Sequence, residues 1–149
     1  MIKKIIIGLL ITLISLVAYI FLIAGNVKYT EEIEINANIE KVVALFDNPY
    51  NMEIYMHGIE SYTVLNGSLR EVGTKAELVV SYIEKDVVKR RIVMIEEIIT
   101  NNLPEEKKVT YTSDGVYNIV TNRFVKISDN ETKFINEQEF QLKCFMKVM

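Results

Sequence analysis

The chain has 149 residues, a single cysteine, a single histidine and no tryptophan. One cysteine excludes an internal disulfide, and the lack of any Cys/His cluster leads us to expect no metal site. Setting aside Lys3 and Lys4, 15 of the 17 basic residues remain against 20 acidic ones, so the rest of the chain has a net charge of −5. This acidity argues against nucleic acid as a partner. No P-loop, dinucleotide-binding fingerprint or nucleophile elbow occurs, and we expect no cofactor and assign no catalytic residue.

The amino-terminal part contains a long apolar run. Ile5 to Ala24 includes no charged residue, and as a helix it would span about 30 Å, the thickness of a bilayer's hydrocarbon core. We therefore expect a transmembrane anchor over residues 1–26 and one globular domain over residues 27–149. Lys3 and Lys4 favour a single-pass protein with a cytoplasmic amino terminus and an extracytoplasmic domain. A cleaved secretory signal is the alternative, and it also exports the domain.

The domain is predicted to begin with one strand and two short helices. Residues 28–35 alternate between apolar and charged side chains, as in a half-buried strand. Residues 39–46 form an amphipathic helix that Asn38 caps and Pro49 ends. A second short helix is expected over residues 50–56.

Six further segments rich in β-branched residues follow, separated by turn signals such as Asn66-Gly67 and Asp114-Gly115. These strands are predicted over residues 59–65, 74–82, 87–99, 107–113, 117–127 and 131–142. Consecutive antiparallel strands with short connections form a meander, which must curl or twist to bury one face. The pattern therefore indicates an α+β fold with a curved antiparallel sheet and two short helices after its first strand.

Several short phrases of the domain have a distinctive spacing. They comprise Ile33, Ile35 and Ala37, then Glu40-Lys41-Val42, Leu45 and Asp47, then Gly58, Ser61, Val64-Leu65, Gly67 and Gly73-Thr74. This spacing resembles the opening of START-like proteins, the SRPBCC or polyketide cyclase/dehydrase superfamily, and the resemblance covers most of residues 29–143. It implies a helix-grip fold that holds lipids, sterols or polyketides between a curved sheet and a long last helix.

The sequence departs from that family pattern in two places. Tyr55 stands where many members carry a tryptophan. Only Cys144 to Met149 follow the last predicted strand, so we expect the C-terminal helix to be largely missing. An open groove would then replace the enclosed cavity of the family.

The resemblance implies that residues on the concave sheet face bind the ligand. The candidates lie in predicted strands and are Tyr82, Met94, Tyr111, Tyr117, Phe124, Gln138 and Phe140. Ordinary core packing is the alternative for each apolar residue. Tyr117 and Phe124 share a face only if a bulge intervenes, because they are seven positions apart. Gln138 and Asn136 share a face with two phenylalanines and are the best polar candidates inside the groove.

Charged residues offer weaker signals. Strand alternation turns one residue of Glu96-Glu97 inward, where it could orient a ligand hydroxyl or act as an acid or base; a solvent-facing pair is the alternative. His57 lies in a predicted turn, which indicates a solvated loop. The basic run Lys89-Arg90-Arg91 divides across both faces, and we expect it to pair with carboxylates such as Glu77 and Glu84.

Three functions fit these observations. The first is membrane-anchored binding of a hydrophobic small molecule or lipid without catalysis, since a tether raises the local concentration of membrane-derived ligand. The second is an interaction module whose open groove accepts a partner helix or a second copy, as a homodimer. The third is a polyketide cyclase-like enzyme, which would need an inward Glu96 or Glu97 within reach of a tyrosine hydroxyl.

Overall fold

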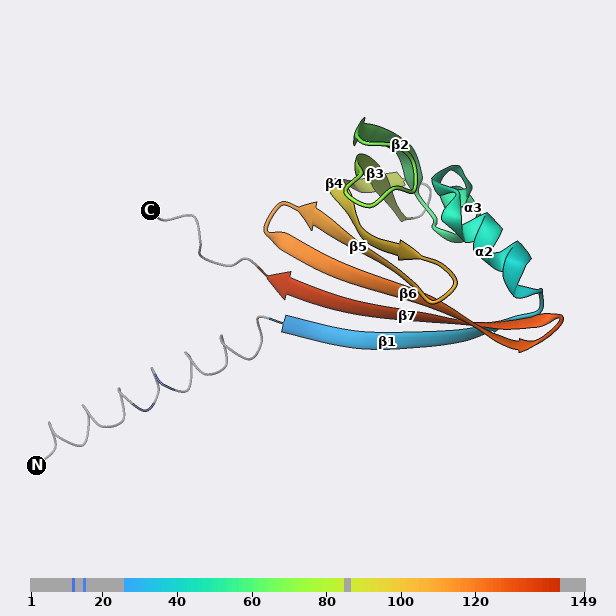
Figure 1. Cartoon of the computed structure of the whole chain (residues 1–149). Helices are drawn as coiled ribbons and strands as arrows, with labels where there is room; N and C mark the ends of the chain where they lie inside the picture. Colours follow the sequence, from blue (N-terminus) through green and yellow to red (C-terminus); the bar gives the residue numbers. More distant parts are fainter. Residues whose placement is uncertain (1–11, 13–14, 16–25, 85–86, 143–149) are drawn as a thin grey trace, which may run out of the picture.

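Seven strands and three short helical elements make up the part of the chain that the structure describes (Figure 1). The structure is a computed structural model, and it describes residues 12, 15, 26–84 and 87–142. The elements are β1 (Asn26–Ile35), α2 (Ile39–Asp47), η1 (Pro49–Asn51), α3 (Met52–Tyr55), β2 (Ile59–Asn66), β3 (Lys75–Glu84), β4 (Val87–Asn102), β5 (Glu106–Ser113), β6 (Val116–Ser128) and β7 (Glu131–Leu142). The predicted order of strands and helices is confirmed. The predicted second helix is divided into η1 and α3.

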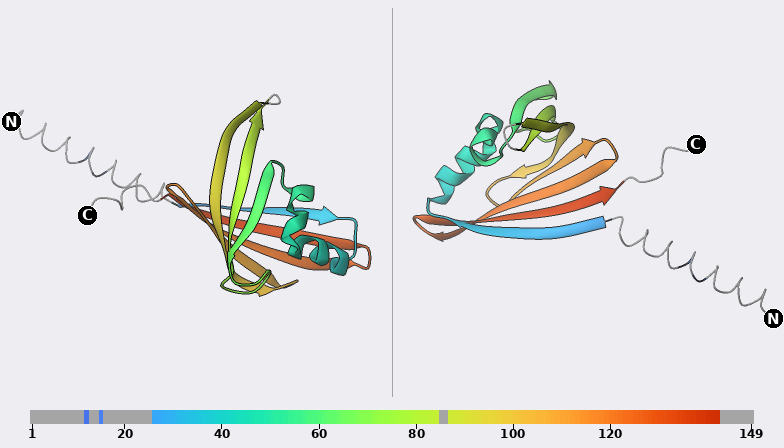
Figure 2. Two further views of the ribbon diagram at one scale, coloured as in Figure 1. Left: turned by 90° about the horizontal axis from the view of Figure 1, so that it is seen from above. Right: turned by 180° about the vertical axis from the view of Figure 1, so that it is seen from behind.

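The strands form one antiparallel sheet in the order β1-β7-β6-β5-β4-β3-β2. β2 to β7 form the predicted meander, and β1 closes the order by pairing with the last strand, with Ile33 opposite Phe134. The sheet curls, so that β2, β3 and β4 stand at a steep angle to β1 and β7 (Figure 2). Register shifts interrupt the β2–β3, β3–β4 and β4–β5 pairings, and such bulges increase the local twist of a sheet.

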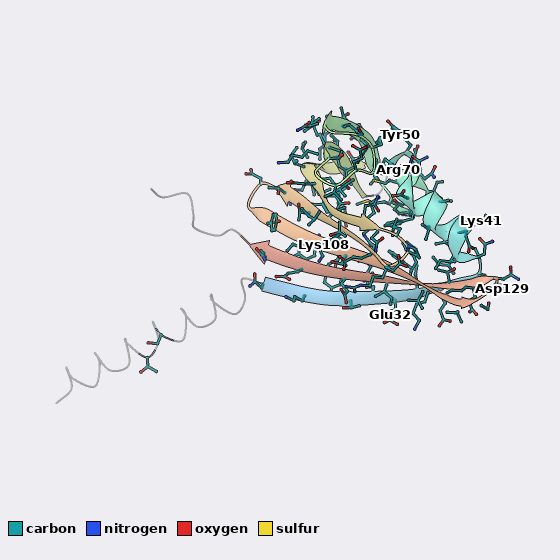
Figure 3. All side chains as sticks on the ribbon, viewed as in Figure 1. Glu32, Lys41, Tyr50, Arg70, Lys108 and Asp129 are labelled. Atoms are coloured by element: carbon teal, nitrogen blue, oxygen red, sulfur yellow. The ribbon has the colours of Figure 1, made fainter. Side chains whose placement is uncertain are left out.

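The two faces of the sheet carry different side chains. Charged side chains lie on the outer face, where Glu32 pairs with Lys133 at 3.2 Å (Figure 3). The basic run has a different partner from the expected ones, because Arg91 forms its ion pair with Glu60 of β2 and not with Glu77. Strand pairing brings Glu60 beside β3 and β4 from a position that is distant in sequence.

The helix α2 is held at one end of the concave face. Its N-cap is the predicted one, since the Asn38 side chain accepts a hydrogen bond from the Lys41 backbone N–H at 2.9 Å. At its other end, the Phe46 ring lies 5.1 Å from the Phe124 ring and 5.6 Å from the Phe134 ring. Each aromatic pair of this kind contributes about 0.5–1.5 kcal/mol beyond simple area burial.

Asp47, the last residue of α2, adds a polar connection. Its carboxylate lies 3.0 Å from Lys107 Nζ on β5 and 3.5 Å from the Arg70 guanidinium in the β2–β3 connection. Asn101 of β4 donates a hydrogen bond to the same carboxylate at 3.3 Å. One side chain therefore joins the helix to three other parts of the domain.

The first strand is more exposed than its alternating sequence predicts. Every residue of β1 except Ile35 is exposed, and the Ile33 side chain is 55% exposed. The helix α2 packs on β6 and β7 through Phe46, and within residues 26–84 and 87–142 no further helix lies over β1. Its apolar face is correctly oriented, with Ile33 opposite Phe134, but it is not buried.

Two sequence-based expectations fall on residues that are not described. Apart from residues 12 and 15, the expected anchor at Ile5–Ala24 lies outside the described residues, and so does the expected short terminus at residues 143–149. Among the residues that are described, no helix has the length and apolar character needed to cross a bilayer.

Gly58 is where the chain turns into β2, and it provides a test of this packing. It has φ +84°, and a Cβ placed on it would lie 2.2 Å from the Ser81 carbonyl oxygen. We expect Gly58→Ala to lower the free energy of unfolding by about 3 kcal/mol, because left-handed strain adds to a clash with β3. Urea denaturation measures this change. Gly115→Ala is the control, since Gly115 has φ +76° and open space around it. An equal loss in both variants would contradict the proposed clash.

Candidate ligand-binding cavity

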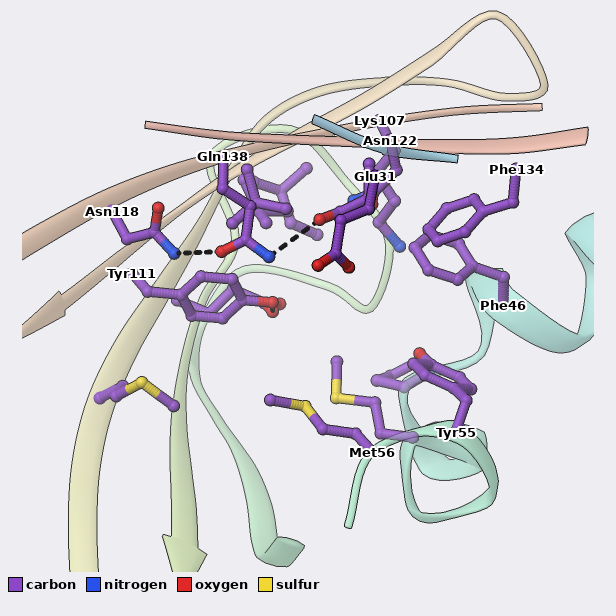
Figure 4. A pocket seen from close by; sticks show the side chains of 18 of the residues that line it. Glu31, Phe46, Tyr55, Met56, Lys107, Tyr111, Asn118, Asn122, Phe134 and Gln138 are labelled. Atoms are coloured by element: carbon purple, nitrogen blue, oxygen red, sulfur yellow. Dashed lines mark hydrogen bonds between the residues drawn. The ribbon is translucent and has the colours of Figure 1, made fainter. Parts of the chain in front are cut away.

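A cavity of about 630 Å³ lies between the concave face of the sheet and the helices (Figure 4). Alternate residues of β4 to β7 line it, together with residues of β1, β2, α2 and α3. Successive side chains of a strand point to opposite faces, so one apolar set from each strand faces inward. A cavity of this size can accommodate a drug-sized molecule.

The cavity brings together most of the residues predicted to bind a ligand. Five of the seven line it, and these are Met94, Tyr111, Phe124, Gln138 and Phe140. They come from four strands, so no single sequence segment contains the site.

The other two predicted residues, Tyr82 and Tyr117, do not line the cavity. The β6–β7 pairing is regular from Val116 to Lys126. Without a bulge between them, Tyr117 and Phe124 face opposite sides of the sheet, and Phe124 is the inward one. Tyr82 lies near the end of β3, beside a register shift, and its side chain is 65% exposed.

Aromatic rings close one end of the cavity. Phe46 of α2 lies against Phe124 and Phe134 and also stacks on Tyr55 at 5.6 Å. Figure 4 shows Phe46 and Phe134 facing each other, with Tyr55 below them. The helical stripe that contains Phe46 was recognisable in the sequence, but its strand partners were not, because they lie far along the chain.

A chain of side-chain amides links the neighbouring strands β6 and β7 on the cavity wall. Asn118 donates to Gln138 at 3.2 Å (Figure 4). Gln138 donates to Asn136 at 2.8 Å, and Asn136 donates to Asn122 at 2.7 Å. The inward position of Gln138 and Asn136 was predicted; the β6 partners follow only from the register of β6 against β7. The Asn118 Oδ1 atom is buried and has no hydrogen-bond partner among the described residues.

A buried carboxylate stands on the β4 wall. Glu96 is 3% exposed, whereas Glu97 faces outward and lies 3.4 Å from Lys75 Nζ. The Tyr62 hydroxyl donates a hydrogen bond to Glu96 Oε1 at 2.9 Å, and the Tyr111 hydroxyl donates to Oε2 at 2.7 Å. The prediction that one residue of the pair turns inward is therefore confirmed. Tyr62 is a site residue that sequence reasoning missed.

The surroundings of Glu96 disfavour tyrosinate. Burial, followed by the charge of Glu96, raises the pKa of Tyr55 to about 12. The same two causes raise the pKa of Tyr62 and Tyr111 well above the ordinary value, and the hydrogen bonds to Glu96 contribute further. These phenols therefore remain neutral hydrogen-bond donors across the physiological pH range.

Removing the charge of Glu96 tests this electrostatic coupling. In Glu96→Gln the burial remains and the negative charge is lost. The pKa values of the coupled tyrosines should therefore fall but stay above the ordinary value, because burial is the larger cause. Alkaline titration of tyrosinate absorbance measures the shift, with circular dichroism reporting on folding. Glu97→Gln is the matched control and should leave the curve unchanged. Identical curves for wild type and Glu96→Gln would contradict the coupling.

Comparison with known proteins identifies the fold. The sequence matches no family model and no curated protein. Norcoclaurine synthase from Thalictrum flavum superposes with a TM-score of 0.60 at 16% identity, covering 79% of this chain and 70% of that one. The Zhui aromatase/cyclase from Streptomyces sp. R1128 superposes with a TM-score of 0.66 at 11% identity, covering 80% of this chain and 70% of that one. Ara h 8.0201 superposes with a TM-score of 0.63 at 13% identity, covering 84% of this chain and 83% of that one. The domain therefore shares the START-like, or SRPBCC, fold of these proteins.

Proposed function

We propose that this domain binds a hydrophobic small molecule or lipid in its concave cavity, without catalysis. The observation that carries the proposal is a cavity of about 630 Å³ whose wall, among the described residues, is mainly apolar. An apolar face that is open to water favours occupation by an apolar partner. Ile33 and Met56 are lining residues that remain 55% and 36% exposed, which supports an accessible cavity.

The fold comparison supports the same class of function. A norcoclaurine synthase structure of this fold contains dopamine and hydroxybenzaldehyde, with a TM-score of 0.59 and 16% identity to this chain. Folds host many functions, so the argument for binding here rests on the cavity itself. The neighbour supports the proposal only by analogy.

We further propose that the apolar run at residues 5–24 anchors the domain beside a membrane. Its length and lack of charge support a single span, and Lys3 and Lys4 support an extracytoplasmic domain. A short tether would hold the cavity close to lipids or to other molecules dissolved in the bilayer. A homodimer through the uncovered groove remains a prediction, which the sedimentation velocity of the full-length chain would test.

Blocking the cavity tests ligand binding. Met94 lines the cavity and Val93, its neighbour on β4, is 50% exposed. We expect Met94→Trp to weaken binding of the uncharged probe 4-phenyl-1-butanol about tenfold or more, because the indole fills the space. Calorimetric titration of the full-length chain in phosphatidylcholine nanodiscs, with empty nanodiscs subtracted, measures the affinity. Val93→Trp is the control and should bind as wild type. Equal affinities in both variants, or no binding by wild type, would refute the proposed site.

A second candidate function is acid–base catalysis on a polyketide-like substrate. The observation that favours it is the contact of the buried Glu96 with the Tyr62 and Tyr111 hydroxyls. Glu96 would remove a proton from the carbon beside a substrate carbonyl. A tyrosine hydroxyl would then donate a hydrogen bond to the enolate oxygen that forms. Reprotonation of the same carbon from Glu96 restores the substrate, so the step balances without another reactant.

Deuterium exchange tests this second candidate. With 4-phenyl-2-butanone in deuterated water, a catalytic Glu96 should accelerate exchange of the protons next to the carbonyl by about a hundredfold or more over buffer. Proton NMR measures the rate. Glu96→Gln should lose the acceleration and Glu97→Gln should keep it. Exchange at the buffer rate with wild-type protein would eliminate this candidate and leave the binding proposal intact.

A further inference from the structure

The charges around the cavity are not paired evenly. The two cationic residues of its wall, Arg70 and Lys107, both form ion pairs with Asp47. The two anionic residues of its wall, Glu31 and Glu96, have no ion pair with any cation in the described part of the chain. Together with Asp47, these groups leave one negative charge in excess. The unpaired charge of the cavity is therefore negative.

Of the two anions, Glu96 is the one that most needs a counter-charge. It is 3% exposed, and its hydrogen-bond partners are two neutral hydroxyls. Burying a carboxylate without a counter-charge is unfavourable, and hydrogen bonds from neutral donors offset only part of the cost. Lys107 does not act as the counter-ion of Glu96, because it forms an ion pair with Asp47. It also lies four residues from Tyr111 along β5, and Tyr111 is the residue of that strand that contacts Glu96.

The polar wall beside Glu96 includes Asn118. Asn118, Tyr111 and Glu96 lie opposite one another on β6, β5 and β4. Since neighbouring strands are about 4.8 Å apart, Asn118 lies about 10 Å from Glu96 on the same wall. The Asn118 Oδ1 atom has no hydrogen-bond partner among the described residues, but it is buried away from the cavity surface. Glu96 is therefore the charged group that a ligand meets on this wall, and a ligand carboxylate would face a like charge.

We propose that the ligand is a hydrophobic amine, with its protonated nitrogen at Glu96 and its apolar body toward the aromatic end of the cavity. This inference rests on the proposed binding function and specifies its ligand class. The ammonium group supplies a counter-charge that no described residue provides, and it makes charge-assisted hydrogen bonds to the carboxylate. Tyr62 and Tyr111 lie next to that position and provide aromatic rings beside a cation. The rings of Phe46 and Phe134 contact the apolar body.

Three probes that differ only in the polar group test the proposal. They are 4-phenylbutylamine, 4-phenyl-1-butanol and 4-phenylbutanoate, titrated calorimetrically into the full-length chain in phosphatidylcholine nanodiscs. We expect the amine to bind about tenfold or more tighter than the alcohol, and the acid to bind weakest. Glu96→Gln should remove the preference for the amine and change the affinity for the alcohol by no more than about twofold. Glu97→Gln is the matched control and should retain the preference.

The results separate the two proposals. Equal binding of amine and alcohol by wild type would overturn the amine proposal and leave a hydrophobic cavity in place. Tighter binding of the acid would also overturn it. Absence of binding by all three probes would refute the binding function itself. The wild-type ratio of amine to alcohol affinity decides the question even if Glu96→Gln fails to fold, which circular dichroism would detect.

Discussion

The cavity depends on how α2 is fixed to one end of the sheet. Phe46 packs on Phe124 and Phe134, and Asp47 pairs with Lys107 and Arg70. The aromatic contacts bury apolar surface, and the ion pairs fix the end of the helix over β5 and the β2–β3 connection. Because α2 is held at that end, it covers only part of the concave face. The inner residues of the remaining strands, such as Ile33, stay accessible.

The curvature of the sheet explains why partial coverage by the helix leaves a cavity. A twisted antiparallel sheet presents a concave apolar face, and one short helix packed on it cannot fill the concavity completely. Register shifts in the pairings of β2 to β5 add to the bend. The bend turns the inner face of β4 toward the helices, so that Tyr62 and Tyr111 converge on Glu96. The curvature therefore creates the cavity and brings the two hydroxyls to the Glu96 carboxylate.

Glu96 gives the cavity a chemical character that its shape alone lacks. Buried charged groups in proteins are usually paired with an opposite charge, and an exception calls for an explanation. Here two neutral phenols are the only hydrogen-bond partners of a carboxylate among the described residues. Their raised pKa values keep them as donors. The two proposed functions give this carboxylate different roles. In a binding protein it would be the counter-charge of a ligand, and in an enzyme it would be a base.

The amino-acid sequence was sufficient to predict the strands, the turns, the Asn38 cap and the inward direction of one residue of Glu96-Glu97. These features depend on local periodicity and capping, which act over a few residues. The tertiary structure decided the pairing of β1 with β7, the outward position of Tyr117, the Glu60 partner of Arg91 and the contact of Tyr62 with Glu96. Each of these depends on strand register and bulges between distant segments, and a shift of one residue would reverse the side-chain faces.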